Sequence, residues 1–152
     1  MECLRRAAGP DLDVLLPLVA EFYRIDRHAF DESAVRRALA PLLTGDDAGQ
    51  VHLITTPAGA VDGYAVLTWG YSLESGGREG LVDELYVRGR NAGLGGQALE
   101  ELLAHARRAG CRVVFLETEA HNPRVRRFYA RHGFAVEESV WMSTVLDGSP
   151  GR

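Results

Sequence analysis

The chain contains no lysine, and all 17 of its basic residues are arginine. This absence excludes a catalytic Schiff-base lysine and a P-loop, because both depend on a lysine ammonium group. Cysteine is scarce as well: Cys3 and Cys111 form no CxxC pair and are too few for a disulfide framework. Both lie beside apolar residues, so we expect them to be buried packing residues.

Long hydrophobic runs are also missing. No apolar run approaches the 18 residues of a membrane-spanning helix, and the first residues lack the apolar segment of a signal peptide. The net charge of −4 does not favour a nucleic-acid partner, and the five histidines show no HxxxH or HExxH metal spacing. We therefore expect a cytoplasmic protein that binds no membrane, no nucleic acid and no metal ion.

The chain length, 152 residues, suits a single domain over 1–152. Apolar residues recur at helical spacing near the N-terminus and again after Asp31 or Ser33, which predicts two helices. The period then changes to that of strands over Val51–Thr55 and Ala60–Tyr71, which we interpret as an antiparallel hairpin.

The clearest unit lies in the second half of the chain. A strand over Leu81–Val87, a helix over about Gly93–Arg108 and an apolar strand over Cys111–Thr118 form a β–α–β crossover. Such a crossover makes its two strands parallel. Together these elements predict an α+β fold with a mixed sheet and helices on both faces.

A further helix and a closing pair of strands follow. Asn122 and Pro123 are typical of the N-cap and the first residue of a helix. Beyond this helix, Phe134–Val136 and Val140–Val145 have the composition of strands, so we expect them to close the sheet.

The turn before the predicted helix over Gly93–Arg108 is rich in glycine. Gly93, Gly95 and Gly96 allow a ligand to approach the backbone closely, and free N–H groups at a helix N-terminus attract anions. Arg88 and Arg90 add positive charge. A pyrophosphate fits this description, although a glycine-rich loop that only turns the chain has the same composition.

A dinucleotide-binding fingerprint is a rival interpretation of the same turn. Gly93, Gly95 and Ala98 match the GxGxxA pattern, and Glu117 would be the ribose-binding acid. However, five residues separate the strand from the first glycine, and too little chain follows for the further β–α units of that fold. We therefore disfavour this reading.

Two motifs resemble the GNAT (Gcn5-related N-acetyltransferase) superfamily. Arg90-x-x-Gly93-x-Gly95 matches the coenzyme motif Q/R-x-x-G-x-G/A of that family. The downstream signature, N-x-x-A-x-x-x-Y-x-x-x-G-F, is present with valine in place of its alanine. Its residues here are Asn122, Val125, Tyr129, Gly133 and Phe134. The stretch between the strand and Arg90 is about two residues shorter than is usual in the family.

The resemblance implies a three-layer α/β/α fold whose mixed, mostly antiparallel sheet is splayed between its fourth and fifth strands. It also implies that acetyl-CoA binds in the gap between these strands as the cosubstrate. By the same resemblance, the coenzyme-binding residues are Leu85, Tyr86, Val87, Arg90, Asn91, Ala92, Gly93, Leu94, Gly95, Gly96, Gln97, Asn122 and Tyr129.

The implied reaction is transfer of an acetyl group to a primary amine of a small molecule or a peptide. Tyr129 matches the family tyrosine that protonates the leaving thiolate. Glu117 and Glu84 are alternative general bases, and a mechanism without a protein base stays open. A non-catalytic acyl-CoA sensor with the same fold is the alternative function. Because family members often dimerise, the resemblance also implies a homodimer in which Val140–Val145 pairs with, or swaps between, subunits.

Overall fold

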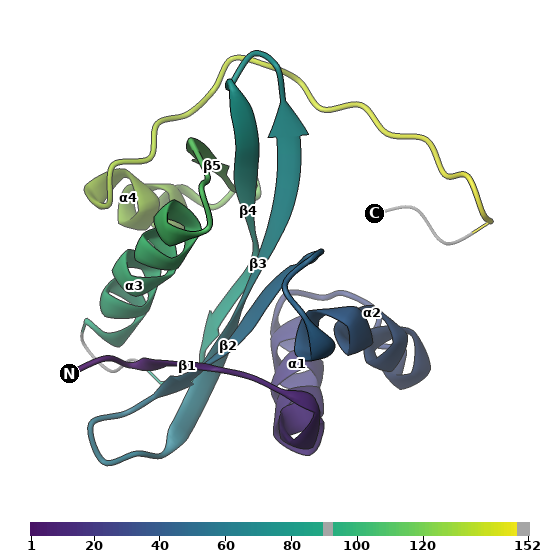
Figure 1. Cartoon of the computed structure of the whole chain (residues 1–152), viewed down its shortest axis with the longest axis vertical. Helices are drawn as coiled ribbons and strands as arrows, with labels where there is room; N and C mark the ends of the chain where they lie inside the picture. Colours follow the sequence, from purple (N-terminus) through teal and green to yellow (C-terminus); the bar gives the residue numbers. More distant parts are fainter. Residues whose placement is uncertain (90–92, 149–152) are drawn as a thin grey trace.

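The computed structural model describes residues 1–89 and 93–148 of the chain. Over these residues, five strands form one sheet in the order β1-β2-β3-β4-β5 (Figure 1). The strands are β1 (Leu4–Arg6), β2 (Gly49–Thr55), β3 (Val61–Ser72), β4 (Gly77–Val87) and β5 (Val113–Phe115). The helices are the short 3₁₀ helix η1 (Gly9–Asp11), α1 (Leu12–Ile25), α2 (Glu32–Thr44), α3 (Leu94–Arg108) and α4 (Pro123–Arg131).

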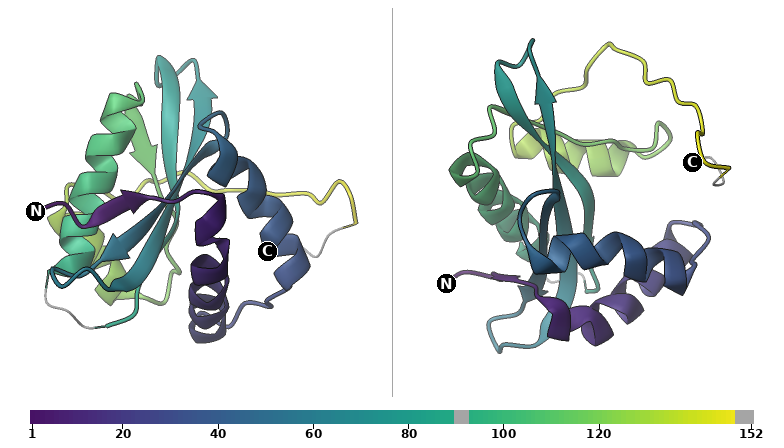
Figure 2. Two further views of the ribbon diagram at one scale, coloured as in Figure 1. Left: turned by 60° about the horizontal axis from the view of Figure 1, so that its bottom comes forward. Right: turned by 45° about the vertical axis from the view of Figure 1, so that its right-hand side comes forward.

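The sheet is mixed, as predicted. β1 to β4 pair antiparallel with their neighbours, whereas β5 runs parallel to β4. This parallel pair is joined through α3, which confirms the β–α–β crossover. α1 and α2 cover one face of the sheet, and α3 and α4 lie on the other (Figures 1 and 2). The chain therefore has the three-layer α/β/α arrangement that the resemblance implies.

Each face of the sheet has its own apolar core. The core beneath α1 and α2 contains Leu15, Leu53 and Tyr64, each fully buried. The core beneath α3 contains Leu67 and Leu102 and extends to the half-buried Cys111. No helix of the described residues is both long enough and apolar enough to cross a membrane.

Two of the predicted helix starts are present. The Asp31 carboxylate accepts a hydrogen bond from the Ala34 N–H (3.2 Å), and the Asn122 side chain accepts one from the Val125 N–H (3.2 Å). Each cap satisfies one of the free donors in the first turn of a helix, which is why these residue types favour the position. Pro123 is the first residue of α4.

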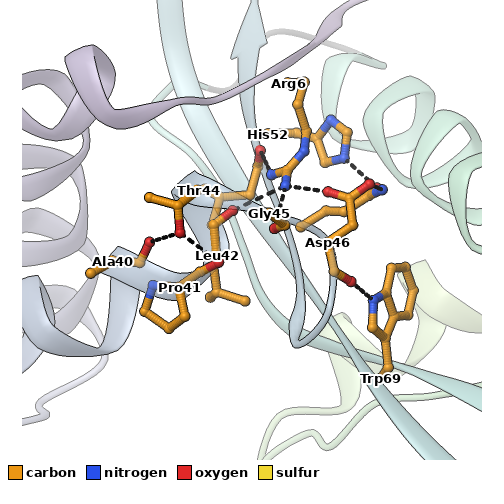
Figure 3. A network of polar contacts seen from close by, with 11 residues as sticks. Arg6, Ala40, Pro41, Leu42, Thr44, Gly45, Asp46, His52 and Trp69 are labelled. Carbon is orange, nitrogen blue, oxygen red and sulfur yellow. Dashed lines mark hydrogen bonds and ion pairs between the residues drawn. The ribbon is translucent and has the colours of Figure 1, made fainter.

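A polar network ties α2 to the sheet (Figure 3). The Arg6 guanidinium donates to the carbonyls of Leu42 (3.0 Å) and Gly45 (3.1 Å) at the C-terminal end of α2, and to the Asp46 carboxylate (2.6 Å). A cation at this end complements the helix dipole and pairs with carbonyls that lack helical partners. The Trp69 indole N–H donates to the Asp46 carbonyl (2.6 Å), which fixes the same loop to β3.

The structure corrects the predicted ends of the sheet. β5 covers only Val113–Phe115 rather than Cys111–Thr118, because only these residues lie against β4. The prediction that Phe134–Val136 and Val140–Val145 form closing strands is wrong, because residues 134–148 contain no strand. A strand needs hydrogen bonds to a neighbouring edge, and this segment runs away from the sheet instead (Figure 1).

Candidate active site between β4 and β5

β4 and β5 share only a short stretch of pairing. Their register runs from Glu79 opposite Val113 to Leu81 opposite Phe115, after which β5 ends and β4 continues to Val87. A cleft of about 1,420 Å³ lies along this unshared part of β4. It extends through the splayed sheet, because residues of α1 line it on one face and residues of α3 and α4 line it on the other.

A β-bulge sets which side chains of β4 face each layer. Val82 lies opposite Leu67 and Glu84 lies opposite Val66, so Asp83 is the extra residue that the bulge inserts. As a result, Val82 belongs to the core beneath α3, whereas the Glu84 side chain points toward α1. The alternation of a regular strand would have placed both side chains on one face.

Glu84 is held by two tyrosines at the wall of the cleft. The hydroxyls of Tyr23, from α1, and Tyr64, from β3, each donate to one of its carboxylate oxygens at 2.6 Å. Burial raises the pKa of Glu84, while the two hydroxyl donors act in the opposite direction. A partly buried carboxylate with a raised pKa that lines a cleft has the properties of a general base.

The glycine turn meets the cleft at the start of α3. Gly93 is the N-cap and adopts φ +93°, a left-handed conformation that favours glycine. The first turn of α3 contains no acidic residue, and no side chain at its N-cap accepts a hydrogen bond from the free N–H groups. A Cβ on Gly95 would lie 3.9 Å from both Phe128 and Val87, so glycine leaves open the narrow space between α3, α4 and β4. These features suit an anionic group at the helix N-terminus.

α4 supplies the opposite wall of the cleft. Tyr129 lines the cleft and packs edge-on against the rings of Phe128 and Phe134. Burial raises the pKa of the Tyr129 hydroxyl, which keeps it protonated at neutral pH. Asn122 also faces the cleft; because its side-chain oxygen caps the helix, its amide nitrogen is the group that remains for a ligand.

The structure brings most of the predicted site residues together. Those lining the one cleft are Glu84, Leu85, Val87, Gly95, Glu117, Asn122 and Tyr129. The two predicted bases differ in setting: Glu84 is largely enclosed, whereas Glu117 is exposed and follows the end of β5. Arg90, Asn91 and Ala92, which carry part of the predicted coenzyme motif, lie outside the described residues.

Four other predicted residues have different surroundings. The Tyr86 hydroxyl donates to Glu21 of α1 (2.7 Å), so only its backbone is near the cleft. Leu94 is buried in the core beneath α3, and Gly96 lies against the His132 ring. The Gln97 amide donates to the Met1 carbonyl (2.6 Å) and to Glu101 (3.0 Å), which ties α3 to the N-terminal strand.

Several residues that line or support the cleft were not identified by the sequence analysis. Tyr64 lies in an apolar run of β3, so its pattern indicates only a core residue; its bond to Glu84 depends on the β3–β4 register. Asp26 and His28 follow α1, and the His28 Nε2 lies 2.8 Å from the Asp26 carboxylate at the rim of the cleft. An isolated Asp-x-His after a helix carries no signal that distinguishes it from ordinary surface.

Comparisons with known proteins agree with this geometry. The family model described as "Acetyltransferase (GNAT) family" matches residues 17–134. The uncharacterized N-acetyltransferase YhfO of Bacillus subtilis (strain 168) is 27% identical over 133 residues, which cover 86% of this chain and 88% of YhfO.

Two solved structures have the same fold over nearly the whole chain. The integron cassette protein HFX_CASS3, from the mobile metagenome of Cole Harbour Salt Marsh, is 34% identical with a TM-score of 0.83. The match covers 95% of this chain and 90% of that protein. A protein from Arthrobacter sp. FB24 is 25% identical with a TM-score of 0.81, and the match covers 96% of this chain and 97% of that protein.

Proposed function

We propose, since the chain belongs to the GNAT acetyltransferase family, that it transfers the acetyl group of acetyl-CoA to a primary amine of a small molecule or a peptide. The observation that carries the proposal is the single cleft between β4 and β5. An anion-attracting helix start, a partly buried carboxylate and a protonated tyrosine all border this one space.

The residues present fit the coenzyme part of acetyl-CoA. The N–H groups at the start of α3 would hold the pyrophosphate, because no acidic side chain competes with it in that turn. The unshared edge of β4 at Leu85 and Val87 would offer backbone groups to the pantetheine amides. The Asn122 amide would contact the same arm from the opposite wall.

Glu84 is the residue that we propose as the general base. An aliphatic amine has a pKa of about 10.4, so only about one molecule in 10³ is neutral near pH 7. The amine nitrogen must lose a proton as it forms its bond to the thioester carbonyl carbon. Glu84 accepts that proton directly or through one water molecule, and its raised pKa makes it a stronger base than an exposed carboxylate.

Tyr129 is the residue that we propose as the general acid. When the carbon–sulfur bond breaks, the thiolate of coenzyme A leaves, and a phenol of raised pKa beside it can supply the proton. Backbone N–H groups of the open β4 edge stabilise the negative oxygen that develops before this step. The products are the acetylated amine and the free thiol of coenzyme A.

A thiol-release assay over a panel of amines tests the proposed activity. The panel contains simple diamines, amino sugars, free amino acids and short peptides with a free N-terminus, and mass spectrometry identifies any acetylated product. We expect amine-dependent thiol release that Tyr129→Phe reduces. Binding of acetyl-CoA without amine-dependent release from any panel member contradicts the proposal and supports a non-catalytic acyl-CoA sensor.

A further inference from the structure

The two tyrosines that hold the Glu84 carboxylate lie in different surroundings. Tyr64 donates to Oε1 and Tyr23 donates to Oε2, each at 2.6 Å. Tyr64 is 0% exposed in the core beneath α1 and α2, whereas Tyr23 is half-buried and lines the cleft. One carboxylate oxygen therefore has its donor in the core, and the other has its donor at the cleft.

The Tyr64 side chain is fixed in place by its neighbours. Its ring contacts Phe22 of α1 edge-on, with the ring centroids 6.3 Å apart, and it contacts the Tyr86 ring across the β3–β4 pair (6.2 Å). Leucine, valine and alanine side chains form most of the core around it. A hydroxyl in such a core that left its acceptor would lose the hydrogen bond without water to replace it. The Tyr64 hydroxyl therefore stays on Oε1.

The Tyr23 hydroxyl lies at the cleft, where water or a bound amine can reach it. A water molecule there can take over its hydrogen bond to Oε2 at little cost in free energy. A carboxylate oxygen also accepts at two positions, so Oε2 has a second position beside the one that Tyr23 occupies. The oxygen on the cleft side is thus the one that a proton from the cleft can reach.

We infer that Tyr64 is a positioning residue for Glu84: it keeps Oε1 as a fixed acceptor in the core, so that Oε2 receives the proton of the amine at the cleft. The assignment rests on the proposed function, because it takes Glu84 as the general base. In the reaction, an N–H bond of the attacking amine breaks and its proton bonds to Oε2. The proton passes to water after the acetylated product leaves. Tyr64 acts only through the carboxylate.

Removing the two hydroxyls one at a time tests the inference. Carboxyl ¹³C NMR follows the titration of Glu84 in the ligand-free protein, and the loss of its signal in Glu84→Gln assigns it. Hydrogen bonds to the charged form lower the pKa of an acid, so we expect Tyr64→Phe to raise the pKa of Glu84 by about one or more. Tyr23→Phe should raise this pKa less, because water replaces the lost donor. Both variants keep the aromatic ring, so the core keeps its packing.

A matched control removes another buried tyrosine hydroxyl. Tyr86→Phe deletes a hydroxyl that also donates to a carboxylate, in this case that of Glu21 (2.7 Å). The other groups around Glu84 are unchanged in all three phenylalanine variants: burial raises the pKa of Glu84, Asp83 of β4 raises it further, and His28 after α1 lowers it. We expect the titration of Glu84 in Tyr86→Phe to follow wild type.

The titrations decide the inference without any measurement of activity. A rise in Tyr64→Phe that is no larger than in Tyr23→Phe, or that Tyr86→Phe matches, overturns it. Kinetics tests the proposed base separately: the acid limb of the kcat/KM profile should move to higher pH in Tyr64→Phe by the same amount as the titration. An acid limb that stays in place while the titration moves shows that Glu84 is not the base. That result overturns the inference through the proposed function and not through the hold of Tyr64 on Glu84.

Discussion

His52 makes the stability of this protein sensitive to acid. Its side chain is buried, 1% exposed, in β2; one ring nitrogen, Nε2, contacts the Gln50 side-chain oxygen (3.1 Å), and Nδ1 has no hydrogen-bond partner in the described structure. Burial, together with the nearby His105 and Arg6, lowers the pKa of His52 to about 3. In the unfolded chain the pKa of a histidine is about 6.5.

The size of the effect follows from these two pKa values. Below pH 6.5 the unfolded chain takes up a proton that folded His52 does not, so the free energy of unfolding falls as the pH falls from 6.5 toward 3. Between pH 7 and pH 5 this loss amounts to about 2 kcal/mol from His52 alone. For a chain of this length the melting temperature would fall by about 4–8 °C.

Urea unfolding at pH 7 and pH 5 measures the loss. Because other groups also titrate, the informative quantity is the difference between wild type and His52→Leu, which has no proton to gain. We expect the variant to lose about 2 kcal/mol less than wild type over this interval. The same substitution at the exposed His121 serves as the control and should follow wild type. Equal losses in wild type and His52→Leu would refute the reasoning.

Three further predictions concern the cleft. Tyr129→Phe should lower kcat about 100-fold or more while leaving acetyl-CoA affinity unchanged, because only proton donation is removed. Steady-state kinetics measures kcat, and calorimetric titration measures the affinity. Glu84→Gln should lower kcat/KM about 100-fold and abolish the fall of kcat/KM at acid pH, because the general base is removed. Glu117→Gln should lower kcat/KM less than tenfold. If Glu117→Gln has the larger effect, the base is Glu117 instead of Glu84. Gly95→Leu should weaken acetyl-CoA binding, since the leucine side chain would enter the cleft. It should not lower the melting temperature, because residue 95 lies in a helix, where leucine is favoured over glycine. Unchanged affinity for acetyl-CoA would exclude the start of α3 from the site.

The sequence was most informative where the determinants are local. The β–α–β unit from β4 to β5 was predictable because the apolar period, the glycine turn and the helix stop all lie within residues 77–115. The Asp31 and Asn122 caps were predictable for the same reason, since each involves a side chain and a backbone group three residues away. The two family motifs predict a coenzyme site at the start of α3 and along α4.

Features that depend on packing between distant segments were not predictable. The bonds from Tyr23 and Tyr64 to Glu84 need α1 to pack on the sheet and β3 to pair with β4 around a bulge. The pattern of Val140–Val145 favours a strand, yet a strand forms only where a neighbouring edge is present. Local pattern indicates which secondary structure a segment can form, and not whether a neighbouring edge is present to pair with it.

The central claim, that the cleft between β4 and β5 binds acetyl-CoA, is tested most directly by a thermal-shift titration with acetyl-CoA, free coenzyme A and NADH. A ligand at 100 times its Kd adds about 2.7 kcal/mol to the free energy of unfolding, which raises the melting temperature of a chain of this size by about 5–10 °C. We predict that both coenzyme A species stabilise the protein and that NADH does not. Stabilisation by NADH alone, or by none of the three, would contradict the assignment of the cleft.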